Sequence, residues 1–160
     1  HRDLHSFPTR RSSDLLFDNA KIVYTHARLL PPSKISGTTL EKTVVSDGCI
    51  ILASRVEHSV VGIRARIGKG TTIANCYIMG NDYYQNLDEI DTEYNNGKVM
   101  GIGERCYLNY CIFDKNVHIG NDVRINGGKH LPDTNNELYS VKDGVVVIKK
   151  GAILPNGFVI

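Results

Sequence analysis

The sequence predicts an all-β fold in which short strands coil into a triangular solenoid, and three observations predict it. Aliphatic residues recur at every sixth position, glycine often follows them, and neither common secondary-structure period explains the spacing. The three series are Val61, Ile67, Ile73 and Met79; Tyr107, Phe113, Ile119 and Ile125; and Val141, Val147, Ile153 and Val159. Helices repeat near 3.6 residues and strands near 2, so neither alone produces a six. A short fixed period indicates a β-solenoid built from hexapeptide repeats.

Each side of the predicted triangle consists of one strand and one turn. Three sixes make a coil of about 18 residues, and each aliphatic residue stacks on its equivalent roughly 4.8 Å along the axis. Asparagine or glycine at a corner tolerates backbone angles that a Cβ disfavours, and we expect Asn116, Gly120 and Asn121 at corners. Because backbone hydrogen bonds run between coils, the end coils need caps or partners. A β-sandwich would instead show strands about 8 to 12 residues apart without a fixed period.

Two segments that lack this pattern precede the solenoid. Residues 1–15, HRDLHSFPTRRSSDL, have no apolar stretch like that of a secretory signal. Within them, HSFPTRRSSDL resembles the translation of a sequencing-library adapter, so we expect a non-native segment at the front of a fragment. Residues 16–34 form a predicted entry segment or linker, since Pro31 and Pro32 cannot sit in a central strand.

The solenoid is predicted over residues 35–160, with two insertions. Residues 81–99 are polar and acidic and contain a helical candidate at 87–94, and residues 126–140 form the second insertion. Loops of this length on a rigid scaffold usually have a function or lie in an interface.

Composition excludes several classes of function. Among 160 residues, 41% are hydrophobic and 22% charged, as in ordinary globular domains. The formal net charge of +2 offers no strong field for nucleic acid, and no window approaches the roughly 20 apolar residues of a membrane span. The cysteines are Cys49, Cys76, Cys106 and Cys111. They lack metal-ligand spacing, so we interpret each as a small buried hydrophobe and expect no metal site.

Several motifs are more specific than the repeat. They are ARLLPPSK at 27–34, HSVVGIRARIGKG at 58–70, IMGNDYY at 78–84, GIGE at 101–104, FDKNVHIG at 113–120 and DGVVVIKKGAILPNG at 143–157. Together they make residues 16–160 resemble the C-terminal domain of the glucose-1-phosphate adenylyltransferase (ADP-glucose pyrophosphorylase) family. Many acyltransferases share a hexapeptide repeat, whereas the PPSK segment, the IMGNDYY insertion and the KKGAILPNG ending are together specific.

This resemblance implies a left-handed parallel β-helix behind a Rossmann-like nucleotidyltransferase domain. The family makes ADP-glucose and pyrophosphate from ATP and glucose 1-phosphate, toward glycogen or starch. It works as a tetramer that responds to phosphorylated metabolites and phosphate-type anions.

Several further expectations follow from the resemblance. The GxG at 101–103 is isolated at an expected corner of the solenoid, and the chain has no Gly-rich nucleotide loop. We therefore expect no catalytic residue and no cofactor in this fragment, which should be inactive alone, with ATP and Mg²⁺ used by the parent enzyme. The expected partners are the catalytic domain of the same chain, sister subunits and an anionic metabolite. The expected location is the bacterial cytoplasm, or the plastid for a plant or algal source.

Three basic residues match positions that contact anionic effectors in relatives: Arg28, Lys115 and Lys150. Phosphates need fixed cations, for which arginine offers a planar fork and lysine a point charge. Lys115 and Lys150 should lie at turns that are 35 residues apart, which is about two coils minus the distortion by the second insertion. The spacing thus allows the two lysines to lie near each other but does not show it. Lys142 and Lys149 are neighbours that could substitute for them, and plain surface solubility is the alternative role for all of these lysines.

Two other functions stay open at this point. Hexapeptide β-helices also form trimeric acyltransferases, in which a histidine between coils acts as general base, and His58 and His118 are the candidates. A solenoid used only for assembly is the third possibility. Arg64 and Arg66 are expected on solvated faces or in contacts between subunits.

Overall fold

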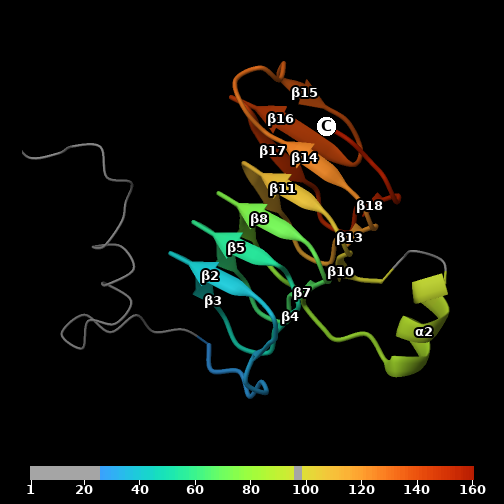
Figure 1. Ribbon diagram of the computed structural model, residues 1–160. Helices are drawn as coiled ribbons and strands as arrows, with labels where there is room; N and C mark the ends of the chain where they lie inside the picture. Colours follow the sequence, from blue (N-terminus) through green and yellow to red (C-terminus); the bar gives the residue numbers. More distant parts are fainter. Residues whose placement is uncertain (1–25, 96–98) are drawn as a thin grey trace, which may run out of the picture.

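The computed structural model describes residues 26–95 and 99–160. Its strands stack into three sheets that surround one axis, which confirms the predicted β-solenoid (Figure 1). The predicted non-native segment at 1–15 and the first ten residues of the entry segment, 16–25, lie outside the described residues. Within the described part, no helix is long and apolar enough to cross a bilayer.

The chain visits the three sheets in turn, so hydrogen-bonded neighbours come from successive coils. Sheet A contains β1 (Lys34–Ile35), β4 (Ile50–Ile51), β7 (Arg66–Ile67), β10 (Gly101–Ile102), β13 (His118–Ile119) and β18 (Ile153–Leu154). Sheet B contains β2 (Thr39–Glu41), β5 (Arg55–Glu57), β8 (Thr72–Ala74), β11 (Tyr107–Asn109) and β14 (Arg124–Asn126). Sheet C contains β3 (Val44–Val45), β6 (Val60–Val61), β9 (Tyr77–Ile78), β12 (Cys111–Phe113), β17 (Val145–Ile148), β16 (Tyr139–Lys142) and β15 (Thr134–Asn135).

The coils are shorter than the sequence predicts. Leu40 pairs with Val56 and Val56 pairs with Ile73, so successive coils are offset by 16 and 17 residues. The missing residues come from sides that have five positions instead of six. Ile51, Val56 and Val61, for example, are all fully buried at intervals of five.

This shortening makes part of the predicted inward series wrong. The buried members are Val61, Ile67, Ile73, Phe113, Ile119, Ile125 and Val141. Met79, Tyr107, Ile153 and Val159 are exposed instead, and Val147 is half-buried. Buried neighbours replace them, namely Ile78, Leu108, Leu154, Val146 and Ile148. Successive side chains in a strand point to opposite faces, so a shift of one residue turns a predicted core residue outward.

Most sides of the triangle bury a second, smaller residue two positions before the large aliphatic one. The residues in this position include Cys49, Ser59, Ala65, Thr71, Cys76, Cys106, Cys111, Val117 and Ala152. All four cysteines are free and buried, which confirms their interpretation as small core residues. The hydroxyls of Ser59 and Thr71 accept the backbone N–H groups of Cys76 and Cys106, each at 3.1 Å. These buried polar atoms are therefore satisfied by the neighbouring coil.

The two insertions leave the solenoid in different ways. The first follows β9 and contains α2 (Leu87–Asn95), which stands beside the coils in Figure 1 and confirms the predicted helix. Glu89 Oε2 accepts the backbone N–H of Asn86 at 2.9 Å, which caps the start of α2. The second insertion, predicted only as an interruption, adds β15 and β16 to sheet C as antiparallel strands.

Candidate anion-binding site

Two of the three predicted effector residues lie at one corner of the solenoid, between sheets C and A. Lys115 follows β12 and Lys150 follows β17. Because Phe113 pairs with Ile148, the two lysines occupy equivalent turn positions on adjacent coils. The two lysines are therefore nearer than two coils, as the allowance for the second insertion permits. The reason is that this insertion places a hairpin, and not a further coil, between them.

Asp82 joins the two lysines. It lies at the start of the first insertion, which leaves the same corner one coil before Lys115. Lys115 Nζ lies 2.6 Å from Asp82 Oδ1, and Lys150 Nζ lies 3.1 Å from Asp82 Oδ2. The side chains of Lys115, Lys150 and Asp82 keep 35%, 59% and 37% of their surface exposed, so a solute can reach all three.

Asn116 completes the cluster with two hydrogen bonds to Asp82. Its Nδ2 donates to Asp82 Oδ2 at 3.1 Å, and its Oδ1 accepts the backbone N–H of Asp82 at 2.8 Å. Asn116 has a φ of +58°, the left-handed conformation that asparagine tolerates better than most residues. Its role as a corner residue is as predicted, and its side chain adds a polar contact that the sequence analysis did not identify.

The donors around Asp82 lower its pKa. Hydrogen bonds from Lys115, from Lys150 and from Asn116 lower the pKa of Asp82 from 3.8 to about 2. Asp82 is therefore ionised at neutral pH, and among residues 26–95 and 99–160 it is the carboxylate that pairs with both lysines. Asp114 is also nearby, and its carboxylate accepts the backbone N–H of Lys115 at 2.6 Å. The two side-chain ammonium groups thus face a single directly paired acid.

The stem of the first insertion is fixed independently of Asp82. Asn81 Nδ2 donates to the Arg64 carbonyl oxygen at 2.8 Å, and Arg64 Nη1 donates to the Asn81 carbonyl oxygen at 3.3 Å. The Arg64 guanidinium lies 5.6 Å from the centre of the Tyr84 ring, and Tyr84 Oη donates to the Gly48 carbonyl oxygen at 2.9 Å. Arg64 is half-buried and makes contacts within the chain, which differs from the expected solvated face, while its expected contact between subunits stays a prediction.

Gly80 allows the chain to leave the coil at this corner. It occupies the turn position equivalent to Lys115, one coil earlier. Its φ is +82°, and a Cβ at this position would overlap the carbonyl oxygen of Ile63. A glycine is therefore required both by the backbone angle and by the close approach of the neighbouring coil.

The structure does not join the other predicted cations to this cluster. Arg28 is exposed, and among the described residues the ion pairs of Asp82 are with Lys115 and Lys150, although Leu30 lies near Gly48 at the same corner two coils below Gly80. Lys142 Nζ pairs with Asp133 at 2.6 Å in the hairpin region. Lys149 Nζ donates to Asn135 Oδ1 and to the Asn136 carbonyl oxygen. Lys142 and Lys149 therefore do not substitute for Lys115 or Lys150 in this arrangement.

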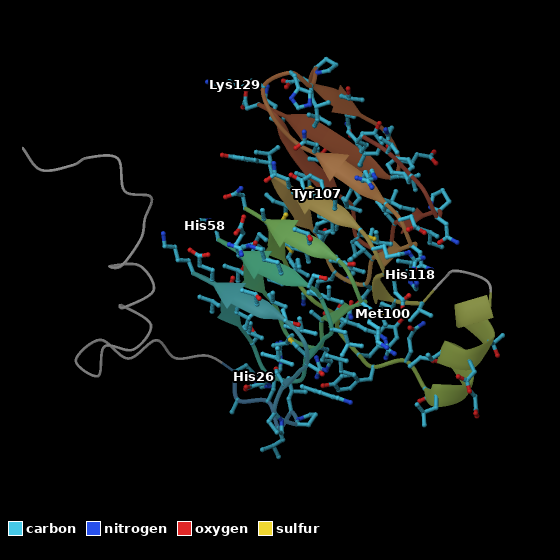
Figure 2. The ribbon with its side chains drawn as sticks, in the orientation of Figure 1. His26, His58, Met100, Tyr107, His118 and Lys129 are labelled. Carbon is cyan, nitrogen blue, oxygen red and sulfur yellow. The ribbon has the colours of Figure 1, made fainter. Side chains whose placement is uncertain are left out.

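The two histidine candidates lie apart from each other. His58 follows β5 at the corner between sheets B and C, where it is exposed and has a φ of +45°. His118 is in β13 of sheet A, and Figure 2 shows it on the opposite side of the solenoid from His58. The two side chains do not form one site within a single chain.

A shallow hollow on the outer face of sheet A is a weaker candidate. Its lining includes Arg66, Met100, Gly103 and Asn156. Its volume of about 110 Å³ is well below the several hundred Å³ of typical metabolite pockets. Among the described residues, no group of three or more histidine, cysteine, aspartate or glutamate side chains is arranged to hold a metal ion.

Sequence reasoning missed Asp82 and Asn116. Asp82 sits inside an acidic insertion, where one carboxylate has no pattern that distinguishes it from its neighbours. Asn116 directly follows Lys115, but its position suggests only a turn residue. The contact depends on stacking of two turns that are more than thirty residues apart in the chain.

One comparison with known proteins bears on this geometry. A family model described as the GLGC left-handed parallel beta-helix domain matches residues 28–159. The match includes both lysines, Asn116, Asp82 and all described residues except 26, 27 and 160. It agrees with the parallel sheets of the structure and with the resemblance noted from the motifs.

Proposed function

This chain belongs to the family of GLGC left-handed parallel β-helix domains, and on that premise we propose that it is a regulatory and oligomerisation domain of a glucose-1-phosphate adenylyltransferase. The parent enzyme would join ATP and glucose 1-phosphate into ADP-glucose and pyrophosphate, on a catalytic domain that uses Mg²⁺. This domain would bind a phosphorylated effector at the corner between sheets C and A.

The convergence of Lys115 and Lys150 on one carboxylate is the observation that carries the regulatory part of the proposal. Their ammonium groups bind the two oxygens of Asp82, so they are spaced for two anionic oxygens that are bonded to the same atom. Any two terminal oxygens of a phosphoryl group form such a pair. Hydrogen bonds between ionised partners are about twice as strong as neutral ones. Two lysines on a rigid solenoid therefore provide a preorganised anion site.

Arg28 is the less supported member of the predicted site. Its segment lies at the same corner, through the position of Leu30 beside Gly48, but its side chain points to no partner among the described residues. We propose it as a residue that would contact a larger effector whose other end extends below the two lysines. It would add affinity for a bisphosphate more than for inorganic phosphate.

The outer face of sheet C supports the oligomerisation part of the proposal. In-register apolar side chains form a column there: Val44, Val60, Tyr77, Ile112 and Val147. Ile35 and Leu40 in the first coil are also exposed, at 42% and 39%. Continuous apolar surface of this kind favours a protein partner. We propose sister subunits in a tetramer and the catalytic domain of the same chain as those partners.

The alternatives have less support. An acyltransferase would need a histidine in a cleft that a second subunit completes, and His58 and His118 lie on different faces. A solenoid used only for assembly would give no reason for two lysines to share one acid. Thioester-dependent acyl transfer and phosphate binding are the assays that separate these alternatives from the proposed function.

The test replaces each lysine in a complete enzyme that carries this domain. Lys115→Ala and Lys150→Ala should each raise the effector concentration for half-maximal response, by about tenfold if one charge-assisted hydrogen bond is lost. The unactivated rate should change little, because no catalytic group lies in this domain. Lys142→Ala is the matched control, since its ion pair with Asp133 has the same 2.6 Å length as that of Lys115. An unchanged effector response in both lysine variants would overturn the proposal.

A further inference from the structure

We propose that Asp82 is a resident competitor in the anion site, whose carboxylate occupies the donors that a phosphoryl group takes when it binds. The inference rests on the proposed function of this corner and adds a specificity-determining residue to it. Asn116 becomes the third donor of the site, next to Lys115 and Lys150.

The donor set fits a phosphoryl group better than it fits the carboxylate. Lys115 Nζ, Lys150 Nζ and Asn116 Nδ2 converge on Asp82 at 2.6, 3.1 and 3.1 Å. Two of these three donors share a single oxygen, Oδ2, because a carboxylate has only two. A phosphoryl group has three terminal oxygens and can accept one bond from each donor without sharing. Its second negative charge also balances the second lysine.

The Asp82 side chain can leave without unfolding the insertion. Its backbone N–H is held by Asn116 Oδ1, and the adjacent residues are held by the Asn81–Arg64 exchange and by Tyr84. None of these contacts uses the Asp82 carboxylate. Displacement therefore requires rotation of one exposed side chain and leaves the stem of the first insertion in place.

Tethering makes Asp82 a filter for charge. A tethered group competes at a high effective concentration, because its chain holds it beside the site. A free monoanion such as acetate offers the lysines no more charge than Asp82 does, so it should bind weakly. A phosphate dianion offers twice the charge and can replace it. Asp82 should therefore confine the site to multiply charged anions.

The experiment compares inorganic phosphate binding to variants of the complete 160-residue chain at pH 7.5 and constant ionic strength. Titrations followed by NMR signals of the lysine Nζ groups and of the Asn116 side-chain amide report on the site directly. Asp82→Asn should bind phosphate at least about tenfold more tightly than the unaltered chain, which corresponds to removal of one competing charge. Asp82→Ala should also bind phosphate more tightly. This variant shows whether the gain depends on the amide that Asp82→Asn introduces.

Two controls separate this inference from the proposed function. Asp133→Asn removes a carboxylate from an ion pair of similar length at Lys142 and should leave phosphate binding unchanged. Lys115→Ala combined with Lys150→Ala, in the Asp82→Asn background, should abolish the tight binding. Acetate should compete with phosphate in Asp82→Asn but not in the unaltered chain.

The outcomes are distinguishable. Equal phosphate affinity in the unaltered chain and both Asp82 variants, with the lysines still required, overturns the competitor role and leaves the anion site standing. Phosphate binding that is unchanged when Lys115 and Lys150 are removed, or no binding by any variant, overturns both the competitor role and the proposed function.

Discussion

The corner at Asp82 and the charged cluster around Arg105, in the turn between β10 and β11, use the same residue types in opposite proportions. Arg105 donates to Asp122 Oδ1 and Oδ2 at 2.8 and 2.9 Å, and to Glu104 Oε2 at 3.1 Å. One cation there faces two acids. At the other corner, two cations face the single carboxylate of Asp82.

A third cluster resembles the Arg105 arrangement. Arg55 binds Glu57 at 2.6 Å and Glu41 at 2.8 Å on the outer face of sheet B. A planar guanidinium suits such sharing, because it presents several donors in a fixed fork. An excess of acid around one arginine forms a closed clamp between coils. At the Asp82 corner two lysines are paired directly with one acid, an arrangement that would favour an added anion, and this distinguishes the proposed site from the arginine clusters.

The largest expected effect tests this distinction through phosphate binding. Removing both Lys115 and Lys150 should weaken binding about 100-fold, since two charge-assisted hydrogen bonds of about 1.5 kcal/mol each are lost. Arg105→Ala should leave the affinity within a factor of about two, because its positive charge is already matched by acids. Titration of the variants with inorganic phosphate measures both. Comparable losses of phosphate affinity in Arg105→Ala and in the lysine double variant would contradict the proposed difference between the two corners.

The next effect concerns the backbone that makes the Asp82 corner different. Gly80→Ala should destabilise the chain by about 2 kcal/mol, since it combines a left-handed φ with overlap of a neighbouring carbonyl. Gly151→Ala is the control, because its φ of +70° is similar but no atom lies near its missing Cβ. It should cost about 1 kcal/mol. Equal losses in urea unfolding of the two variants would contradict the close-approach argument.

Much of the fold was predictable because aliphatic residues must line a narrow axis. Phe113, Ile119 and Ile125 lie inward as predicted, since both intervals between them have six residues. Met79 and Tyr107 did not, because sides of five residues move the inward position and the sequence carries no mark of which sides are short. The small residue two positions before most of the large ones, a position that includes every cysteine, was a detectable signal beyond the scattered spacing of the cysteines.

The candidate site was predictable only in its cations. Lys115 and Lys150 stood out through a resemblance, while their contact depends on how the hairpin at β15 and β16 is accommodated. That hairpin shortens the distance between the two turns from two coils to one. Asp82 could not be predicted for a different reason. Its partners lie in turns that are far away in the chain, and an acidic insertion gives no local sign of which carboxylate faces the two lysines.

The smallest expected effect is a dependence of stability on pH that belongs to the lysine-rich corner. The pKa of Asp82 is about 2 in the folded chain against an ordinary value of 3.8. Between these values the unfolded state binds more protons than the folded state, so the contribution of Asp82 is present above about pH 4 and is lost as the pH falls toward about 2. The stability difference between the unaltered chain and Asp82→Asn should shrink over that same range. Urea unfolding in phosphate-free buffer measures it.

The Arg105 corner supplies the comparison for this last measurement. Arg105 also lowers the pKa of Asp122. The stability difference between the unaltered chain and Asp122→Asn should therefore also shrink as the pH falls. The two aspartates differ in the cations that lower their pKa: Lys115 and Lys150 at Asp82, and Arg105 at Asp122. In a background that lacks Lys115 and Lys150, the pH-dependent effect of Asp82→Asn should shrink to the smaller part that the Asn116 hydrogen bond supplies, whereas that of Asp122→Asn should persist in full. An undiminished pH-dependent effect of Asp82→Asn after loss of both lysines would mean that the two cations are not what lowers the pKa of Asp82.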